Sequence, residues 1–438
     1  MRTPPLPLAA LLPLLACSGD DTSTSATGSG TAVATDGTAA GTSAAATSAA
    51  ATSAATDNAT SDTATSGPAT SDTATSGPTT GDPTGDPTAD PTGDPPGPGG
   101  TVPVGGGDYF LLGANYPWKS YGGDFGANNW GTYGVHTKGD EIGGELAGLA
   151  ADRMRVVRWF VLTDGRAGVT FDAQGAPTGL GDHVFEDMDE ALARAEAAGV
   201  YLVPVLLDFS WVFWASQDNG VQMGGHADTI DDPQKRAALV DAVIVPLLDR
   251  YADAPAILAW EIMNEPEWVI ADLPDPAVDG KADPIALADF YALAADVAGE
   301  VHARTAAYVT LGSACLKWSR VWTPAYAAAH GLPALDLDFY QAHYYPWMDG
   351  LSLQGHPDLG TVEFSPKVQD YAPLALDRPL VIGELALSSD AAATLDTLRD
   401  RGWAGAWPWS LNTDFSIDRP GVKAWAEAQG ALVDLPPP

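Results

Sequence analysis

The chain has 438 residues, 45% of them hydrophobic, which is enough to build one large domain or two small ones. Its formal net charge of −36 argues against nucleic acid or anionic lipid as a binding partner, because an acidic surface repels both. The acidity suits a neutral ligand, but by itself it indicates no function.

The first 17 residues are typical of a secretory signal. Arg2 precedes the apolar run LPLAALLPLLA, which is too short to span a bilayer and is followed by a polar tract. The stretch LLAC, ending at Cys17, resembles the bacterial lipobox, in which the cysteine is acylated and becomes the mature N-terminus; an ordinary signal peptide is the alternative. We expect residues 1–17 to be a lipoprotein signal peptide. The predicted location is the bacterial cell envelope, lipid-anchored at the outer surface, or outside the cell.

Residues 18–107 are predicted to form a disordered tether. They consist of Thr, Ser, Ala, Gly, Asp and Pro with almost nothing to bury, and ATSDTATSGP occurs twice in tandem. Such a segment cannot offset the entropy cost of becoming ordered. Beyond it Cys315 is the only cysteine, so the mature domain can form neither an internal disulfide nor a cysteine-based zinc site.

From residue 108, apolar runs typical of strands alternate with amphipathic, Ala-rich segments typical of helices. The predicted strands are 109–116, 154–161, 200–209, 256–264, 306–313, 337–344, 379–385 and 403–411. The predicted helices are 139–151, 182–198, 233–251, 285–303, 319–330, 367–376, 390–401 and 420–430. Asp232 followed by Pro233 is a plausible cap and first-turn pair for the third helix.

Eight near-continuous apolar strands alternating with helices predict a parallel sheet buried on both faces. Their number and the size of the segment 108–438 match one α/β domain with a (β/α)8 TIM barrel. A doubly wound open sheet is the alternative, although no Gly-rich phosphate loop follows the first strand. In a barrel, the residues at the carboxyl ends of the strands face the active site.

Polar and aromatic residues gather at these predicted strand ends. In chain order they are Asn115, Tyr116, Trp118, Arg158, Trp159, Asp208, Trp211, Asn264, Glu265, Lys317, Trp318, His343, Tyr345, Glu384, Trp407 and Trp409. Glu265 and Glu384 end the fourth and seventh strands and would face each other across the barrel mouth. Two facing carboxyl groups are what glycoside cleavage requires, one to protonate the leaving oxygen and one to attack or to activate water.

The motifs WEIMNEP (260–266) and LVIGEL (380–385) resemble those of glycoside hydrolase family 5, the cellulase and mannanase family, over 108–430. The resemblance implies that Glu265 is the acid/base and Glu384 the nucleophile. It further implies that Asn264 binds the 2-hydroxyl, Arg158 supports the nucleophile, His343 and Tyr345 line the site, and Trp409, rather than Trp407, floors the catalytic subsite. One departure is Phe209, which stands where the family often has histidine.

Physical reasoning assigns the same roles. An arginine beside Glu384 would depress its pKa, whereas burial and the facing charge would raise that of Glu265. Tyr345 could hydrogen-bond the nucleophile. Glu261 is predicted to be a structural partner of Arg158, and Glu267 a solvated loop acid.

Tryptophans beyond the strand ends are candidates for stacking on sugar rings, with about half expected to touch ligand. They are Trp118, Trp211, Trp214, Trp268, Trp318, Trp347 and Trp409. The sequence contains no HExxH spacing, so we expect no catalytic metal, and it contains no Gly-x-Ser-x-Gly elbow, so a serine hydrolase is unsupported. We expect no cofactor.

The sequence therefore predicts a retaining glycoside hydrolase of β-linked polysaccharide, with β-1,4-mannan or β-1,4-glucan as substrate. We expect a monomer that contacts the membrane only through its N-terminal lipid. A non-catalytic carbohydrate-binding surface lipoprotein is the alternative from another class, and a different retaining barrel family is a third. The sequence leaves open the sugar, and whether cleavage is endo or exo.

Overall fold

The computed structural model describes residues 100–413 and 416–438. The predicted signal peptide, the lipidation site Cys17 and nearly all of the predicted tether lie outside these residues. Within the described ranges, no helix combines the length and the apolar character needed to cross a membrane.

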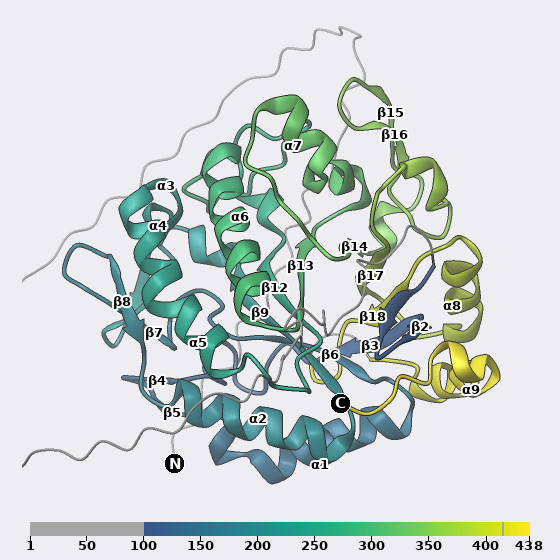
Figure 1. Ribbon diagram of the computed structural model, residues 1–438, viewed down its shortest axis with the longest axis horizontal. Coiled ribbons are helices and arrows are strands. Elements are labelled where there is room, and N and C mark those ends of the chain that lie inside the picture. The colour runs from purple at the N-terminus through teal and green to yellow at the C-terminus, as the bar shows by residue number, and fades with distance from the viewer. Residues whose placement is uncertain (1–99, 414–415) are drawn as a thin grey trace, which may run out of the picture. The chain divides into compact units, whose positions relative to one another are not determined.

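Eight parallel strands close into a barrel, which confirms the predicted (β/α)8 fold and excludes the open sheet (Figure 1). Each strand pairs with the next barrel strand in the chain, and the last pairs with the first. Nearly every residue of these strands is buried, as expected for strands with helices on one face and the barrel core on the other. The barrel strands are β3 (Leu111–Asn115), β6 (Val156–Phe160), β9 (Tyr201–Asp208), β12 (Ala259–Asn264), β13 (Tyr308–Ser313), β14 (Tyr340–Tyr344), β17 (Leu380–Leu385) and β18 (Gly405–Pro408).

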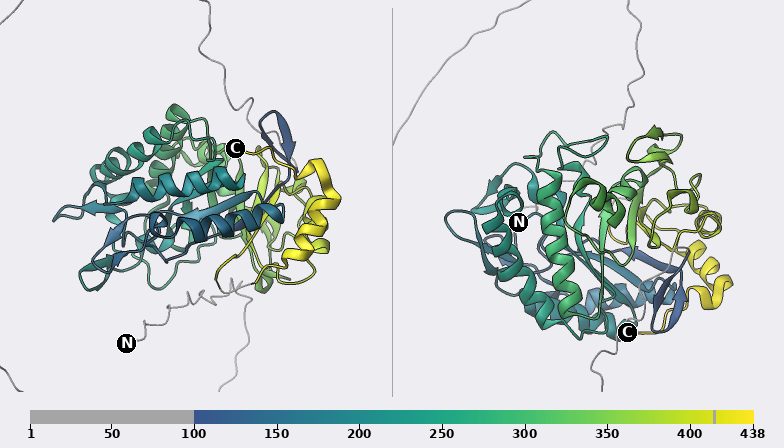
Figure 2. Two further views of the ribbon diagram at one scale, coloured as in Figure 1. Left: turned by 90° about the horizontal axis from the view of Figure 1, so that it is seen from below. Right: turned by 45° about the horizontal axis from the view of Figure 1, so that its top comes forward.

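The helices surround the strands, and Figure 2 shows α8 and α9 side by side next to the hairpin at the start of the domain. Asp232 caps α4, accepting hydrogen bonds from the backbone N–H groups of Gln234 and Lys235, with Pro233 in the first turn as predicted. The helices are α1 (Gly139–Ala151), α2 (Val184–Ala198), α3 (Asp228–Asp231), α4 (Pro233–Leu239), α5 (Val245–Arg250), α6 (Leu287–Arg304), α7 (Pro324–His330), α8 (Ala391–Asp400) and α9 (Arg419–Gln429).

Three predicted helices differ from the structure. The segment 233–251 is divided by a π-helical turn, η3 (Val240–Ile244), which ends two positions before Pro246, whose missing N–H disturbs the regular ladder of hydrogen bonds. The segment 319–330 begins as a 3-10 helix, η5 (Leu316–Trp322), and Thr323 caps a separate α7. The segment 367–376 contains only the short 3-10 helix η7 (Ala372–Leu374).

The described fold begins before the predicted boundary at residue 108. A hairpin of β1 (Val102–Val104) and β2 (Gly107–Tyr109) packs Val102 into an apolar cluster at one end of the barrel, and Tyr308 donates a hydrogen bond to the carbonyl of Pro103. The boundary prediction is therefore wrong by several residues. The reason is that two buried valines suffice to order a strand inside a stretch of low-complexity composition.

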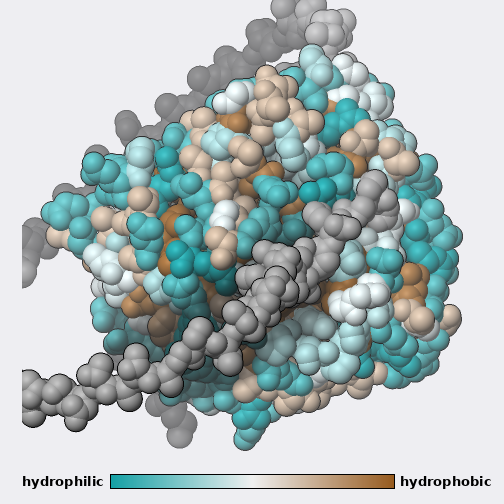
Figure 3. Space-filling view, in the orientation of Figure 1, coloured by the Kyte–Doolittle hydropathy of each residue, from teal (hydrophilic) through white to brown (hydrophobic). Residues whose placement is uncertain are grey.

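Four further hairpins extend the loops that follow barrel strands at the active-site end. They are β4–β5 (Ala127–Asn128, Gly131–Thr132), β7–β8 (Val169–Phe171, Pro177–Leu180), β10–β11 (Ser216–Asp218, Val221–Met223) and β15–β16 (Ser352–His356, Gly360–Glu363). The remaining short 3-10 helices are η1 (Val135–Thr137), η2 (Phe209–Val212), η4 (Pro266–Trp268), η6 (Pro346–Met348) and η8 (Gly430–Leu432). On the face seen in Figure 3, hydrophilic residues are spread among small apolar areas.

Candidate active site

The two glutamates predicted from the strand ends converge at the mouth of the barrel. One carboxylate oxygen of Glu265 and one of Glu384 lie within 4.8 Å of each other, and a ring nitrogen of His343 lies within the same distance of both. Glu265 directly follows β12 in a left-handed backbone conformation (φ 45°, ψ 50°), and its N–H donates to the carbonyl of Gly312 at 2.6 Å. A non-glycine residue in this conformation carries strain of order 1 kcal/mol, which the surrounding contacts hold in place. The short carboxyl separation is that of a retaining rather than an inverting glycosidase.

A fully buried arginine, Arg158 on β6, bonds to a glutamate on each of two other barrel strands, Glu261 on β12 and Glu384 on β17. Its guanidinium binds both oxygens of Glu261 at 2.6 and 2.7 Å, as predicted for that pair, and its Nη1 donates to Glu384 Oε1 at 2.7 Å. Gly312 leaves room for this pair, because a Cβ there would lie 2.4 Å from Glu261 Oε1. Two carboxylates thus share one guanidinium that cannot lose its proton.

Two asparagines fix the remaining donors of Arg158. Asn115 accepts from Nη1 at 3.0 Å and Asn264 accepts from Nη2 at 2.7 Å. The amide of Asn264 in turn donates to Asp208 at 2.8 Å, and that of Asn115 donates to two backbone carbonyls. Burial raises the pKa of Asp208 to about 6, and its hydrogen bonds from Ser210 and Asn264 oppose this rise. Asp208 therefore orients Asn264.

Glu265 lies in surroundings that favour its protonated form. Desolvation raises its pKa to about 7, and a hydrogen bond from Trp268 and the charge of Arg158 only partly oppose this. Trp268 Nε1 donates to Oε2 at 2.8 Å, while His343 Nδ1 lies 2.7 Å from Oε1. The carboxyl group can therefore hold a proton near neutral pH and release it to a leaving oxygen.

Glu384 is the carboxylate with the stronger electrostatic support. Besides Arg158, the hydroxyl of Tyr345 donates to its Oε2 at 2.6 Å, which is the contact suggested from sequence. The expected depression of its pKa is wrong, however: burial raises the pKa of Glu384, and the charge of Arg158 and the Tyr345 hydrogen bond only oppose the rise. Of the two glutamates, Glu384 alone has a directly bonded guanidinium, so it is the one we expect to ionise first.

His343 lies between the two glutamates on β14. Burial lowers its pKa to about 4, so the imidazole is neutral at pH 7. Its Nδ1 faces Glu265 at 2.7 Å and Glu384 at 3.5 Å, and within the described residues its Nε2 has no hydrogen-bond partner. The neutral ring can exchange hydrogen bonds with Glu265 in either protonation state without adding charge. A metal ion among these three side chains is disfavoured by the positive charge of Arg158 next to Glu384.

The chain is similar in sequence to two known proteins. No protein-family model matches the chain. The mannan endo-1,4-beta-mannosidase of Mytilus edulis is 25% identical over 334 residues, covering 70% of this chain and 84% of that protein. That of Cryptopygus antarcticus is also 25% identical, over 359 residues, covering 72% and 84%.

Solved structures show the same barrel. The β-mannanase of Mytilus edulis superposes with a TM-score of 0.62 at 22% identity, covering 78% of this chain and 98% of that one. The β-1,4-mannanase of the sea hare Aplysia kurodai gives 0.61 at 23%, covering 74% and 94%. The barrel and these relatives support the resemblance to glycoside hydrolase family 5. The chain is a glycoside hydrolase, and the non-catalytic alternative is not favoured.

Two of the predicted stacking tryptophans pack with Phe160, next to Arg158, in this hydrolase. The rings of Trp118 and Trp409 are 5.9 Å apart at 73°, and Phe160, which the sequence analysis missed, lies 5.9 Å from Trp118. The guanidinium of Arg158 is 4.9 Å from the Phe160 ring centre. Trp118 and Trp409 remain partly exposed, so each keeps part of its apolar ring accessible.

The stacking prediction is wrong for Trp211 and Trp318. Both are 0% exposed, with their indole N–H groups bonded to Thr229 and to the carbonyl of Pro274. Trp407 is also buried and donates to the carbonyl of Leu111. These tryptophans belong to the core of the hydrolase because the chain turns into short helices after its strands and folds the large rings inward.

Glu267 is not the solvated loop acid that the sequence suggested. It is 0% exposed and accepts hydrogen bonds from the Ser313 hydroxyl, the Ala314 N–H and the Trp322 indole at 2.5, 3.0 and 2.9 Å. Burial raises its pKa to about 7. In the hydrolase this carboxyl group ties η4, the turn that carries Glu265, to the end of β13. The sequence gives no signal for it, since a glutamate after proline is ordinarily a surface residue.

Proposed function

We propose that this hydrolase cleaves β-1,4-mannan internally, with net retention of anomeric configuration. Two observations support the substrate and mode of cleavage: the curated relatives are named mannan endo-1,4-beta-mannosidases, and they align over about seven-tenths of this chain. The observation that carries the retaining chemistry is the separation of at most 4.8 Å between oxygens of Glu265 and Glu384.

Glu384 is proposed as the nucleophile and Glu265 as the acid/base. Glu384, ionised and held by Arg158 and Tyr345, attacks the anomeric carbon to form a glycosyl ester, while the proton of Glu265 passes to the departing oxygen. Glu265, now a carboxylate, takes a proton from water, and the resulting hydroxide releases the sugar and regenerates Glu384. Asn264 is proposed to bind the 2-hydroxyl, and Trp118 and Trp409 to stack on the sugar rings.

The test combines a substrate screen with covalent trapping. Reducing-sugar release should be highest on mannan and glucomannan, lower on galactomannan, and low on carboxymethyl cellulose and xylan. A 2-deoxy-2-fluoro-mannosyl fluoride should label Glu384, as read by peptide mass spectrometry. The Glu384→Ala variant should lose nearly all turnover with an unchanged circular dichroism spectrum, whereas Glu196→Ala, an exposed glutamate on α2, should retain it.

Each outcome bears on a different part of the proposal. Higher activity on cellulose than on mannan would reject the substrate but keep the chemistry. Label on another residue, or Glu384→Ala activity within a few-fold of the unmodified enzyme, would reject the nucleophile. If the intact protein binds mannan without cleaving it, the enzymatic proposal is rejected in favour of a non-catalytic carbohydrate-binding protein.

We also propose that Cys17 is lipidated and that the low-complexity segment 18–99 holds the barrel away from the membrane. Support comes from the LLAC stretch and the low-complexity composition alone. Cys17→Ser should release the protein into the soluble fraction of cells that express the full chain; retention in the membrane fraction would contradict lipidation.

A further inference from the structure

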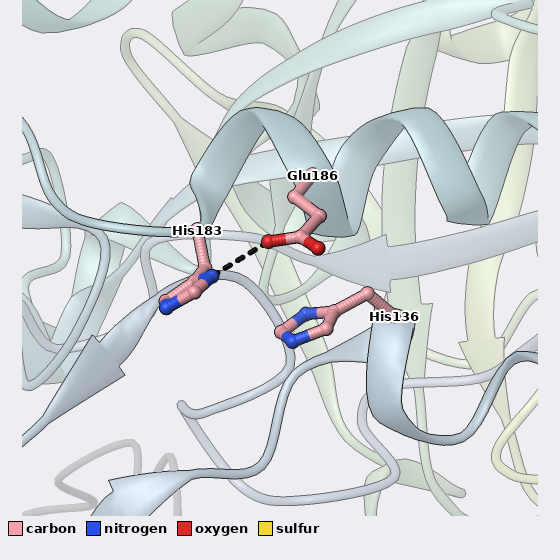
Figure 4. Close-up of side chains that lie close together, drawn as sticks. All are labelled: His136, His183 and Glu186. Carbon is pink, nitrogen blue, oxygen red and sulfur yellow. Dashed lines mark hydrogen bonds and ion pairs between the residues drawn. The ribbon is translucent and has the colours of Figure 1, made fainter.

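Three side chains with metal-binding groups gather outside the active site, where η1 meets the beginning of α2 (Figure 4). They are His136 on η1, and His183 and Glu186 at the N-terminal end of α2. One ring nitrogen of each histidine and one oxygen of Glu186 all lie within 4.8 Å of one another. In the part of the chain that the structure describes, this and the catalytic trio are the two such groups.

His136 is held in a fixed orientation by a buried carboxylate. The carboxylate of Asp187, itself 0% exposed, accepts hydrogen bonds from the backbone N–H groups of Gly126 and His136 at 2.8 and 3.0 Å and contacts His136 Nδ1. Gly134 makes room for it, since a Cβ there would lie 2.1 Å from Asp187 Oδ1. A carboxylate that holds the proton on Nδ1 leaves the lone pair on Nε2, which is the arrangement seen behind metal-bound histidines.

The other two side chains are free to adjust. The side chains of His183 and Glu186 are 40% and 58% exposed, and His183 Nδ1 lies 2.6 Å from Glu186 Oε2. The two imidazole rings stack with centres 5.0 Å apart and planes 16° from parallel. Ligand atoms around a tetrahedral zinc ion lie about 3.3 Å apart, because the bonds are about 2.0–2.1 Å long. Rotation of the exposed His183 and Glu186 side chains can close that difference while His136 stays fixed.

Acidic side chains at the N-terminal end of α2 favour the binding of a cation there. Glu186 and the buried Asp187 both lie in the first turn of the helix, and the chain as a whole is strongly acidic.

We propose that His136, His183 and Glu186 bind one divalent transition-metal ion of the zinc type, with Asp187 as the residue that orients His136. Two imidazoles and a carboxylate suit Zn²⁺ better than Ca²⁺ or Mg²⁺, and water would complete the coordination. The ion would join the loop that follows β3, which carries Trp118, to the helix that follows β6. The site is independent of the proposed reaction, and its role is to fasten the active-site rim.

The test is zinc binding to the full chain, made without a histidine tag and treated with chelator before use. Titration calorimetry at pH 7.5 should give one Zn²⁺ per chain with the unmodified protein. His183→Ala and Glu186→Gln, both at exposed side chains, should weaken binding at least tenfold. The matched control is His330→Ala, a surface histidine 3.6 Å from Asp358 that belongs to neither of the two groups, and it should bind zinc as the unmodified protein does.

A second readout does not depend on affinity. Co²⁺ in a site with two imidazole ligands should give visible absorption bands that His183→Ala abolishes and His330→Ala keeps. The proposal is overturned if the unmodified protein binds zinc no more tightly than His183→Ala, or if His330→Ala loses as much. Activity of these variants measures the catalytic site separately, so failure here leaves the proposed function intact.

Discussion

Replacing Glu265 by glutamine should make the protein more stable at alkaline pH. Burial raises the pKa of Glu265 from 4.5 to about 7, so the folded state binds this proton more tightly than the unfolded chain does. The contribution to the free energy of unfolding is therefore fully present below pH 4.5 and is lost as the pH rises to about 7. One pKa unit corresponds to 1.36 kcal/mol, so the loss amounts to about 3 kcal/mol.

Glutamine cannot ionise and avoids this loss. At pH 5, the Glu265→Gln variant should gain less than about 1 kcal/mol over the unmodified enzyme from this source, and at pH 8.5 about 3 kcal/mol. The quantity to compare is the change in this gain between the two pH values, because the exchange of oxygen for nitrogen next to His343 adds a constant offset. Measurements closer to the sequence pI of about 4.1 are avoided, since solubility is lowest there.

Urea unfolding followed by tryptophan fluorescence provides the measurement, with Glu196→Gln as the control. That exposed change should shift the free energy of unfolding by less than about 0.5 kcal/mol at either pH. An equal gain for Glu265→Gln at pH 5 and pH 8.5 would refute the reasoning, since it would mean that Glu265 is already ionised at pH 5 or that burial does not penalise its charge.

Two further predictions concern the same region. Because Glu265 must be protonated to donate, kcat/KM on mannan should decline above about pH 7, the pKa that burial gives this group; a profile that stays flat to pH 9 would contradict the acid role. Glu267→Ala should lower the free energy of unfolding by about 3–5 kcal/mol, because the buried N–H groups of Ala314 and Trp322 lose their acceptor and a cavity remains. Glu267→Gln keeps an acceptor oxygen and should lose less than half as much by the same urea assay; equal losses would mean that volume alone matters there.

The barrel could be predicted from the chain because its signals are local and repeated. Every barrel strand lies within an apolar run recognised from sequence, and α1 matches the predicted bounds of 139–151. The predicted helices differ from the observed ones where a local helix-start signal competes with the apolar pattern. The helix predicted over 319–330 fails at its beginning because Thr323 and Pro324 form a stronger start signal than the apolar pattern before them.

The site was less predictable than the fold. The strand-end rule brings Glu265, Glu384 and Arg158 together because barrel geometry fixes where strands end. It cannot say whether a side chain beyond a strand turns outward or inward, so Trp318 and Trp409 look alike in sequence, yet Trp318 is buried and Trp409 stays partly exposed beside Trp118. Nor does sequence spacing bring His136 to His183, since the contact depends on the packing of two loops.

The sharing of Arg158 between two carboxylates has a consequence for turnover. When Glu384 becomes an ester in the proposed intermediate, its negative charge disappears, and an arginine paired with it alone would be left as an isolated cation inside the barrel. Glu261 remains bound to the same guanidinium through both oxygens, so the arginine keeps a permanent counter-ion through both halves of the reaction. The charge of Glu384 can thus be lost and restored in each cycle while Arg158 keeps the carboxylate of Glu261 as its partner.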